Sequence, residues 1–97
     1  MKVFNWDEDK NRLLKRERGV SFEQVVLCIE KGKLLDIIEH PNQEKYKGQW
    51  CYVVDLENYV FIVPYVESEE SFFLKTIFPS RKYTRMYLHR RIKNESV

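Results

Sequence analysis

The sequence predicts a single small α+β domain, in which helices pack on an antiparallel β-meander of about four strands. The chain has 97 residues, the usual size of one domain, so residues 1–97 are expected to form one unit. With 43% hydrophobic and 33% charged residues, it is too apolar for a disordered chain and too charged for a membrane-spanning one. The apolar spacing is helical before Gly32 and alternating after it, which predicts helices first and strands second.

The first third of the chain predicts a short strand and two helices. Val3–Trp6 alternates apolar and polar residues, as a strand does. Asp7 can cap the first helix because its carboxylate accepts hydrogen bonds from unpaired backbone N–H groups, and Gly19 can end that helix in the left-handed conformation. Residues 21–24 read Ser-Phe-Glu-Gln, a capping box, and the second helix is expected to run from there to Gly32.

The middle of the chain predicts the sheet. Its β-branched and aromatic runs are residues 34–38, 50–56, 59–66 and 72–78. Residues 41–48 form a polar loop between the first two runs, and only Glu57 and Asn58 separate the next two, which predicts a hairpin with a two-residue turn. Pro64 cannot donate to a strand ladder, so it is expected at a sheet edge or a bulge.

A basic C-terminal helix is predicted over residues 80–93, packed on the same face of the sheet as the other helices. Tyr83, Met86, Tyr87 and Arg90 have the spacing of its inner stripe. The net charge is +5 over residues 81–97 and −3 over residues 1–80, although the whole chain carries only +2. Such a cluster attracts phosphate groups or an acidic partner protein.

Several kinds of chemistry have no pattern in the sequence. Cys28 and Cys51 lie inside apolar runs without metal-ligand spacing, so both are expected to be core residues. His40 and His89 are far apart, and neither has a second ligand at a recognised spacing, so no metal site and no cofactor are expected. The N-terminal residues do not form an export signal, which predicts a cytoplasmic protein.

Cations and aromatic rings remain as candidates for function. Cleavage of RNA by its own 2′-hydroxyl requires a positioned phosphate, stabilisation of negative charge and groups that move protons. Positioning and charge could come from three side chains near the start of the last helix: Arg81, Lys82 and Arg85. A base could stack on one of three tyrosines: Tyr83, Tyr87 and Tyr65. The alternative is that these cations are solvated and the tyrosines belong to the core.

Three segments resemble the BrnT toxins of bacterial type II toxin–antitoxin modules. They are Phe4-Asn5-Trp6-Asp7-Glu8-Asp9-Lys10, Gly19-Val20-Ser21-Phe22-Glu23 and Ser80-Arg81-Lys82, and the similarity runs in order from Phe4 to about Leu88. This resemblance implies a RelE-like fold and a metal-independent endoribonuclease that arrests translation, on or off the ribosome. It also implies a ribbon-helix-helix antitoxin as partner, whose complex with the toxin represses its own operon, and it allows a heterotetramer.

The resemblance also implies site residues. Glu17-Arg18-Gly19 stands where BrnT proteins read Lys-His-Gly, and Arg81 and Lys82 match the family's Ser-Ala-Arg-Lys motif. The expected catalytic residues are therefore Arg18, Glu17, Arg81 and Lys82. Near Thr76 the family has an arginine, and here Lys75 is the closest cation; together with Arg85, Tyr83 and Tyr65 it is expected to bind RNA. The general base stays open among Glu17, His40 and Tyr65.

Two other readings remain beside the ribonuclease. Because Glu17 and Arg18 replace the lysine and histidine, the chain could keep the fold and the antitoxin interface yet cleave RNA poorly, as a binding module. Alternatively, the aromatic hairpin from Trp50 to Tyr65 could be a protein-interaction surface. A sheet needs such residues inside, however, so most of them are expected in the core.

Overall fold

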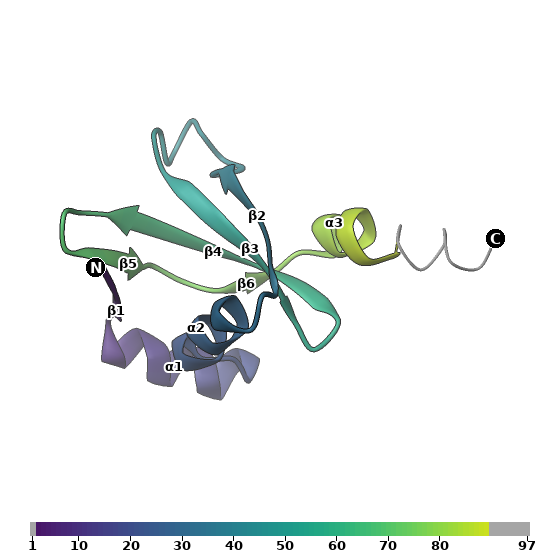
Figure 1. The fold of residues 1–97 in the computed structure, drawn as a ribbon, viewed down its shortest axis with the longest axis horizontal. Coiled ribbons are helices and arrows are strands. Elements are labelled where there is room, and N and C mark those ends of the chain that lie inside the picture. The colour runs from purple at the N-terminus through teal and green to yellow at the C-terminus, as the bar shows by residue number, and fades with distance from the viewer. Residues whose placement is uncertain (1, 90–97) are drawn as a thin grey trace.

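The computed structural model describes residues 2–89 of the chain. Its elements, in order, are β1 (Val3–Trp6), α1 (Glu8–Arg18), α2 (Phe22–Glu30), β2 (Leu34–Glu39), β3 (Trp50–Leu56), β4 (Tyr59–Glu67), β5 (Ser71–Leu74), β6 (Phe78–Pro79), α3 (Arg81–Thr84) and the π-helix η1 (Arg85–His89). The predicted α+β class is confirmed, with two helices before the sheet and one helical segment after it (Figure 1).

The sheet has six strands rather than about four. The strand order is β1-β5-β4-β3-β2, and β6 pairs with β4 beyond the end of β5. The hairpin from β3 to β4 forms as predicted, and Glu57 and Asn58 take the positive φ angles of 55° and 68° that its two-residue turn requires. β1 adds the only parallel pairing among the described strands, to β5. No local pattern predicted that long-range pairing.

Pro64 explains why the last predicted strand, residues 72–78, divides into β5 and β6. It lies in β4, an interior strand, so the expected sheet edge is wrong, but the pairing on one side of β4 is interrupted opposite it. Its carbonyl accepts the N–H of Lys75 at 2.8 Å, but it has no N–H to donate in return. The partner strand therefore leaves the ladder after Leu74, and pairing with β4 resumes only at Phe78.

The helices cover both faces of the sheet, and the prediction of one covered face is wrong. Phe22 and Val25 of α2 pack with Val54 and Val63 on one face. The alternate side chains of the same strands point to the other face, where α3 and η1 contribute Leu88 and the half-buried Tyr83 and Tyr87. In Figure 1, α3 accordingly lies apart from the paired α1 and α2.

The inner stripe of the last helix also differs from the prediction. Thr84 and Leu88 are buried, whereas Met86, which was expected inside, is 45% exposed. The inner face is set by Thr84, whose hydroxyl bonds to Ser80 and Val60, and Leu88 follows it four positions later on the same side. The predicted inward position of Arg90 and the helix end at Lys93 lie outside the described residues.

Both cysteines are buried and free, as predicted for core residues. Burial raises the pKa of Cys51 to about 12 and also raises the pKa of Cys28. The Cys28 thiol donates to the carbonyl of Asp55 at 2.9 Å, so it acts as a packed hydrogen-bond donor. Among the helices of residues 2–89, none has the length and apolar content needed to cross a membrane.

Candidate functional site

The corner between α1 and α2 holds Arg18 in place. Gly19 ends α1 with φ 68°, a left-handed conformation that a residue with a Cβ adopts at a cost. Asn11, which is fully buried, accepts the N–H of Phe22 at 2.8 Å through its Oδ1. Its Nδ2 donates to Glu23 at 2.8 Å, and this bond is the main reason that the pKa of Glu23 is lowered. The two helices are therefore joined by a rigid turn.

Arg18 connects this corner to the segment that leads into α3. Its Nη1 donates to the carbonyl oxygen of Ile77 at 2.6 Å. A guanidinium has five N–H donors, so this bond leaves most of them available, and Arg18 is exposed. The orientation of the guanidinium is thus set by backbone that lies 59 positions further along the chain.

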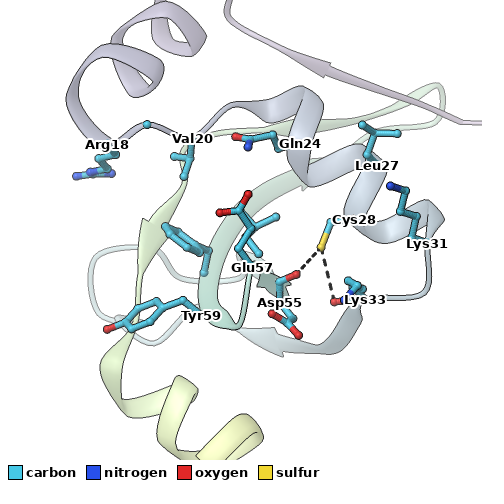
Figure 2. Close-up of a pocket in the computed structure, with 13 residues that line it drawn as sticks. Arg18, Val20, Gln24, Leu27, Cys28, Lys31, Lys33, Asp55, Glu57 and Tyr59 are labelled. Carbon is cyan, nitrogen blue, oxygen red and sulfur yellow. Dashed lines mark hydrogen bonds between the residues drawn. The ribbon is translucent and has the colours of Figure 1, made fainter.

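A cavity of about 520 Å³ opens beside Arg18, between α2 and the β3–β4 hairpin (Figure 2). Its charged lining residues are three cations and two carboxylates: Arg18, Lys31, Lys33, Asp55 and Glu57. Its wall includes Val20 and Cys28 of the core on the α1–α2 face. We call it the Arg18 cavity. Three cations and two carboxylates leave its lining with a formal charge of +1.

The hairpin connects the Arg18 cavity to α3. Tyr59 and Phe61 line the cavity, and Phe61 pairs with Pro79. Ser80 follows, and its N–H donates to the carbonyl of Val60 at 2.9 Å. Figure 2 shows Tyr59 between the cavity and the helix that begins after Ser80. The cavity and the start of α3 therefore share one edge of the molecule.

The first turn of α3 is fixed by three hydrogen bonds of hydroxyl groups. Ser80 Oγ accepts the N–H of Tyr83 at 3.1 Å, which caps the helix. Thr84 Oγ1 donates to the Ser80 carbonyl at 2.7 Å and accepts the N–H of Val60 at 2.8 Å. These bonds attach a very short helix to β4. Arg81 and Lys82 remain exposed on the turn, with the Lys82 ammonium 5.5 Å from the centre of the Tyr83 ring.

The structure does not gather all predicted site residues into one hollow. Arg81 and Lys82 are on the protein surface and do not line the Arg18 cavity. Glu17, next to Arg18, is exposed and has no hydrogen bond or ion pair within residues 2–89. Arg85 is also exposed, at the end of α3. The predicted catalytic cations are therefore exposed, and they are not gathered in one cavity.

The remaining predicted RNA-binding residues lie elsewhere. The Lys75 ammonium is 5.8 Å from the centre of the Phe73 ring, and Lys75 lines a different cavity. Tyr65 is only 8% exposed and stacks on Tyr52 with 4.1 Å between ring centres. Most of its surface is thus inside the core, where a base cannot stack on it. Tyr83 is half-buried against the sheet.

Two of the three candidates for the general base are disfavoured by their environment. Burial raises the pKa of Tyr65, so its phenol keeps its proton near neutral pH. His40 is buried, which lowers its pKa, and it does not line the Arg18 cavity. Glu17 is the candidate that is both exposed and adjacent to Arg18.

One polar pair escaped prediction because its members are distant in the sequence. Tyr87 Oη donates to Asp36 Oδ2 at 2.6 Å, across 51 positions of the chain. This hydrogen bond is the largest cause that raises the pKa of Tyr87 to about 12, and burial adds to it. It attaches η1 to β2, at the far side of the sheet from β1.

Two helices packed on one face of a mixed sheet, with a short C-terminal helix on the other, define a BrnT-like α+β fold. The crystal structure of the Brucella abortus ribonuclease toxin BrnT superimposes with a TM-score of 0.59, covering 82% of this chain and 97% of that chain, at 12% sequence identity. A scan against protein-family models finds no match, and a search of curated proteins finds none. At this identity the similarity concerns the fold, and chemistry depends on this chain's own side chains.

Proposed function

We propose that this chain is the toxin of a bacterial type II toxin–antitoxin pair, an endoribonuclease that inhibits translation by cleaving RNA in the cytoplasm. The observation that carries the proposal is the BrnT-like fold, which extends over 97% of the Brucella ribonuclease toxin. The three sequence segments at residues 4–10, 19–23 and 80–82 support the same assignment. The exposed cations along one edge of the molecule provide the surface for RNA.

In the proposed reaction the 2′-oxygen of one nucleotide attacks the adjacent phosphorus. A 2′-O–P bond forms and the P–O5′ bond breaks, which leaves a 2′,3′-cyclic phosphate and a 5′-hydroxyl. The attacking hydroxyl loses a proton to a base, and the leaving oxygen gains one. Negative charge accumulates on the phosphate oxygens during the reaction, so a fixed cation beside them lowers the barrier.

Arg18, Arg81 and Lys82 are the proposed phosphate contacts. Arg18 is oriented by Ile77 and keeps free N–H donors, which suits it to the two oxygens of a phosphate. Arg81 and Lys82 stand on a turn that Ser80 and Thr84 attach to β4. We assign proton transfer to Glu17, because its carboxylate is exposed and lies next to Arg18 in the chain.

Expression in bacteria tests the function and its residues together. The unmodified chain is expected to stop growth and bulk translation on induction. A double variant, Arg81→Ala with Lys82→Ala, is expected to lose about a hundredfold in RNA cleavage and to relieve the arrest. The matched control is Arg16→Ala with Lys47→Ala, which removes the same two charges from exposed positions away from the Arg18 cavity. Normal growth with the unmodified chain contradicts the proposal, and equal toxicity of both double variants contradicts the residue assignment.

Purified protein and end-labelled RNA test the chemistry. Cleavage is expected to continue in excess EDTA, with cyclic-phosphate and 5′-hydroxyl ends. Arg18→Ala is expected to slow RNA cleavage. Arg18→Lys is expected to restore little of the cleavage rate, because an ammonium lacks the planar guanidinium that can donate to Ile77 and to a phosphate at once. Loss of activity in EDTA would show that the reaction needs a metal ion.

A second function, RNA or antitoxin binding with weak cleavage, is favoured by one observation. Among the described residues that line the Arg18 cavity there is no histidine, and Glu17-Arg18 stands where the resembling family has Lys-His. An imidazole that exchanges protons near neutral pH is thus missing from this cavity. RNA binding without cleavage products in the assay above identifies this function.

The proposed partner is a ribbon-helix-helix antitoxin encoded beside this chain. It is expected to bind the toxin, suppress its activity and form a dimer or heterotetramer with it. Co-expression of the neighbouring reading frame, followed by co-purification and measurement of the mass of the complex in solution, tests this expectation. If the protein encoded by the neighbouring reading frame neither binds this chain nor restores growth, the proposed antitoxin partner is contradicted.

A further inference from the structure

A second cavity of about 520 Å³ lies beside α3, on the sheet face opposite the α1–α2 pair. Its lining residues come from the β2–β3 loop, from β4 and from the segment around β6: His40, Asn42, Tyr46, Gln49, Pro64, Lys75, Thr76 and Phe78. Phe78 belongs to the core under α3, which places the cavity on that face. We call it the His40 cavity. Ligand sites commonly have volumes of about 300–1,000 Å³.

His40 is held in one orientation at this cavity. It is only 8% exposed, and its ring stacks on Tyr46 with 4.3 Å between ring centres. Its Nδ1 accepts the N–H of Asn42 at 3.0 Å, so in the neutral ring the proton is on Nε2. Burial lowers the pKa of His40, which favours that neutral form. Nε2 therefore presents a hydrogen-bond donor that has no acceptor within residues 2–89.

The charge of the His40 cavity differs from that of the Arg18 cavity. Within residues 2–89, no carboxylate lines it. Lys75 contributes an exposed ammonium, and the hydroxyl of Thr76 has no hydrogen bond to another described residue. The cavity thus combines one cation and several neutral donors without an opposing negative charge, which suits an anion.

The walls add an apolar and aromatic component. Tyr46, Pro64 and Phe78 line the cavity beside the His40 ring. Aromatic side chains bind nucleobases by stacking on them, whatever the base. A ligand that fits both parts of this cavity has a flat ring system attached to a phosphate.

We propose that the His40 cavity binds one nucleotide unit, with its base against Tyr46 and Phe78 and its phosphate at Lys75 and His40 Nε2. RNA is the source of that nucleotide if the proposed ribonuclease function holds, and this part of the inference rests on that function. The cavity itself requires only the chemistry of a nucleoside phosphate. It is separate from the Arg18 edge, because the two cavities share no lining residue.

Titration with small ligands, followed by NMR, tests the site directly. The probes are the four nucleoside 5′-monophosphates, the corresponding nucleosides and inorganic phosphate. The monophosphates are expected to shift the signals of His40, Tyr46 and Thr76 and to bind at least tenfold more tightly than either nucleosides or phosphate. No shift at millimolar monophosphate overturns the proposal, and so does inorganic phosphate that binds as tightly as the nucleotides.

Two variants separate the contributions of the two parts of the ligand. Lys75→Gln is expected to weaken monophosphate binding about tenfold and to leave nucleoside binding unchanged, because it removes the ammonium from an exposed position. Lys47→Gln is the control, since Lys47 is exposed on the β2–β3 loop but does not line the cavity. Tyr46→Leu is expected to weaken both ligand types. If Lys75→Gln and Lys47→Gln change monophosphate affinity equally, the phosphate assignment is overturned. This comparison does not require that Tyr46→Leu folds.

The source of the nucleotide is tested by competition. A short single-stranded oligonucleotide without 2′-hydroxyl groups cannot be cleaved, and it is expected to displace a bound monophosphate from the cavity. Failure to displace it shows a site for free nucleotides and overturns the link to RNA. If nucleotides bind in the His40 cavity but RNA is not cleaved, the ribonuclease proposal is rejected and the nucleotide site stands. If RNA is cleaved but no nucleotide binds in this cavity, the nucleotide site is rejected and the ribonuclease proposal stands.

Discussion

The two faces of the sheet are covered in different ways, and the difference locates both cavities. On one face, α1 and α2 form a rigid two-helix unit whose side chains build the larger core. On the other face, the short α3 and η1 cover the end of the sheet around Val60 and Ile62 and leave the region around Pro64 to a loop. Each face therefore keeps one cavity of about 520 Å³, beside the β3–β4 hairpin turn on the α1–α2 face and beside the β2–β3 loop on the other face.

The cavities differ in charge for a related reason. The Arg18 cavity is bordered by the turn of the β3–β4 hairpin, in which Glu57 is a turn residue and Asp55 Oδ1 accepts the N–H of Asn58 at 2.8 Å. The His40 cavity is bordered by the irregular segment after β5, which contributes Lys75 and Thr76. Among residues 2–89, carboxylates thus line the cavity beside the hairpin turn and not the other one.

Removing one large side chain from each face of the sheet should show that the core under α1 and α2 contributes more to the free energy of unfolding than the core under α3. Phe22 is fully buried in α2, so Phe22→Ala is expected to lower the free energy of unfolding by about 3–5 kcal/mol, a large part of the stability of a small domain. Tyr83→Ala on the other face is expected to cost less, because Tyr83 is only half-buried. Urea denaturation measures both. A Tyr83 effect as large as that of Phe22 would mean that α3 is as integral to the core as α2.

The attachment of α3 can be tested at Thr84. Thr84→Val keeps the shape of the side chain but leaves the buried N–H of Val60 without its acceptor, and is expected to cost about 1–3 kcal/mol. Thr76→Val is the matched control, since the Thr76 hydroxyl has no hydrogen bond to a described residue. Denaturation midpoints compare the two. Equal midpoints would show that the Thr84 hydroxyl does not hold the helix.

The hydrogen bond between η1 and β2 should contribute less to stability than the Thr84 bonds, and its contribution should be lost at alkaline pH. Tyr87→Phe removes the bond to Asp36, which is exposed, and is expected to cost about 0.5–1 kcal/mol. The folded protein raises the pKa of Tyr87 to about 12, above its ordinary value of 10.0. Its contribution is thus complete below pH 10 and is lost as the pH rises through about 12. Stability of the wild type and of Tyr87→Phe should converge in that range, and parallel curves would contradict the assignment.

The smallest expected effect is the titration of His40. Because burial lowers its pKa, protonation favours the unfolded chain, so stability contributed by neutral His40 is present above the ordinary value of 6.5 and declines as the pH falls below it. NMR of the imidazole ring is expected to show a midpoint below 6.5. A midpoint at or above that value would indicate a negative group near the ring and contradict the charge pattern of the His40 cavity.

Local signals predicted most of the elements correctly. Asp7, Gly19 and the capping box at Ser21 set the ends of α1 and α2, and the structure contains each of these caps. Glu57-Asn58 forms the predicted turn. The errors concern Pro64, Met86 and the face covered by α3. Each depends on which strand or helix lies opposite, and that information is absent from a local pattern.

The candidate site was only partly predictable. Arg18, Arg81 and Lys82 were predicted from the resemblance to BrnT toxins, Arg81 and Lys82 at matching residue types and Arg18 where the family has a histidine. The bond from Arg18 to Ile77, the pair of Tyr87 with Asp36 and the His40 cavity were not. Their members are separated by tens of residues, so no spacing within the sequence records them.

The sequence by itself determined the α+β class, the helix caps, the hairpin turn and the concentration of positive charge after residue 80. These depend on neighbours along the chain, whose hydrogen bonds and conformations act over a few residues. Tertiary structure decided that β1 joins β5, that helices cover both faces, that Tyr65 belongs to the core, and that Arg18 points to the segment before α3. Those outcomes depend on how much apolar surface two distant segments can bury together, and only the folded chain decides that.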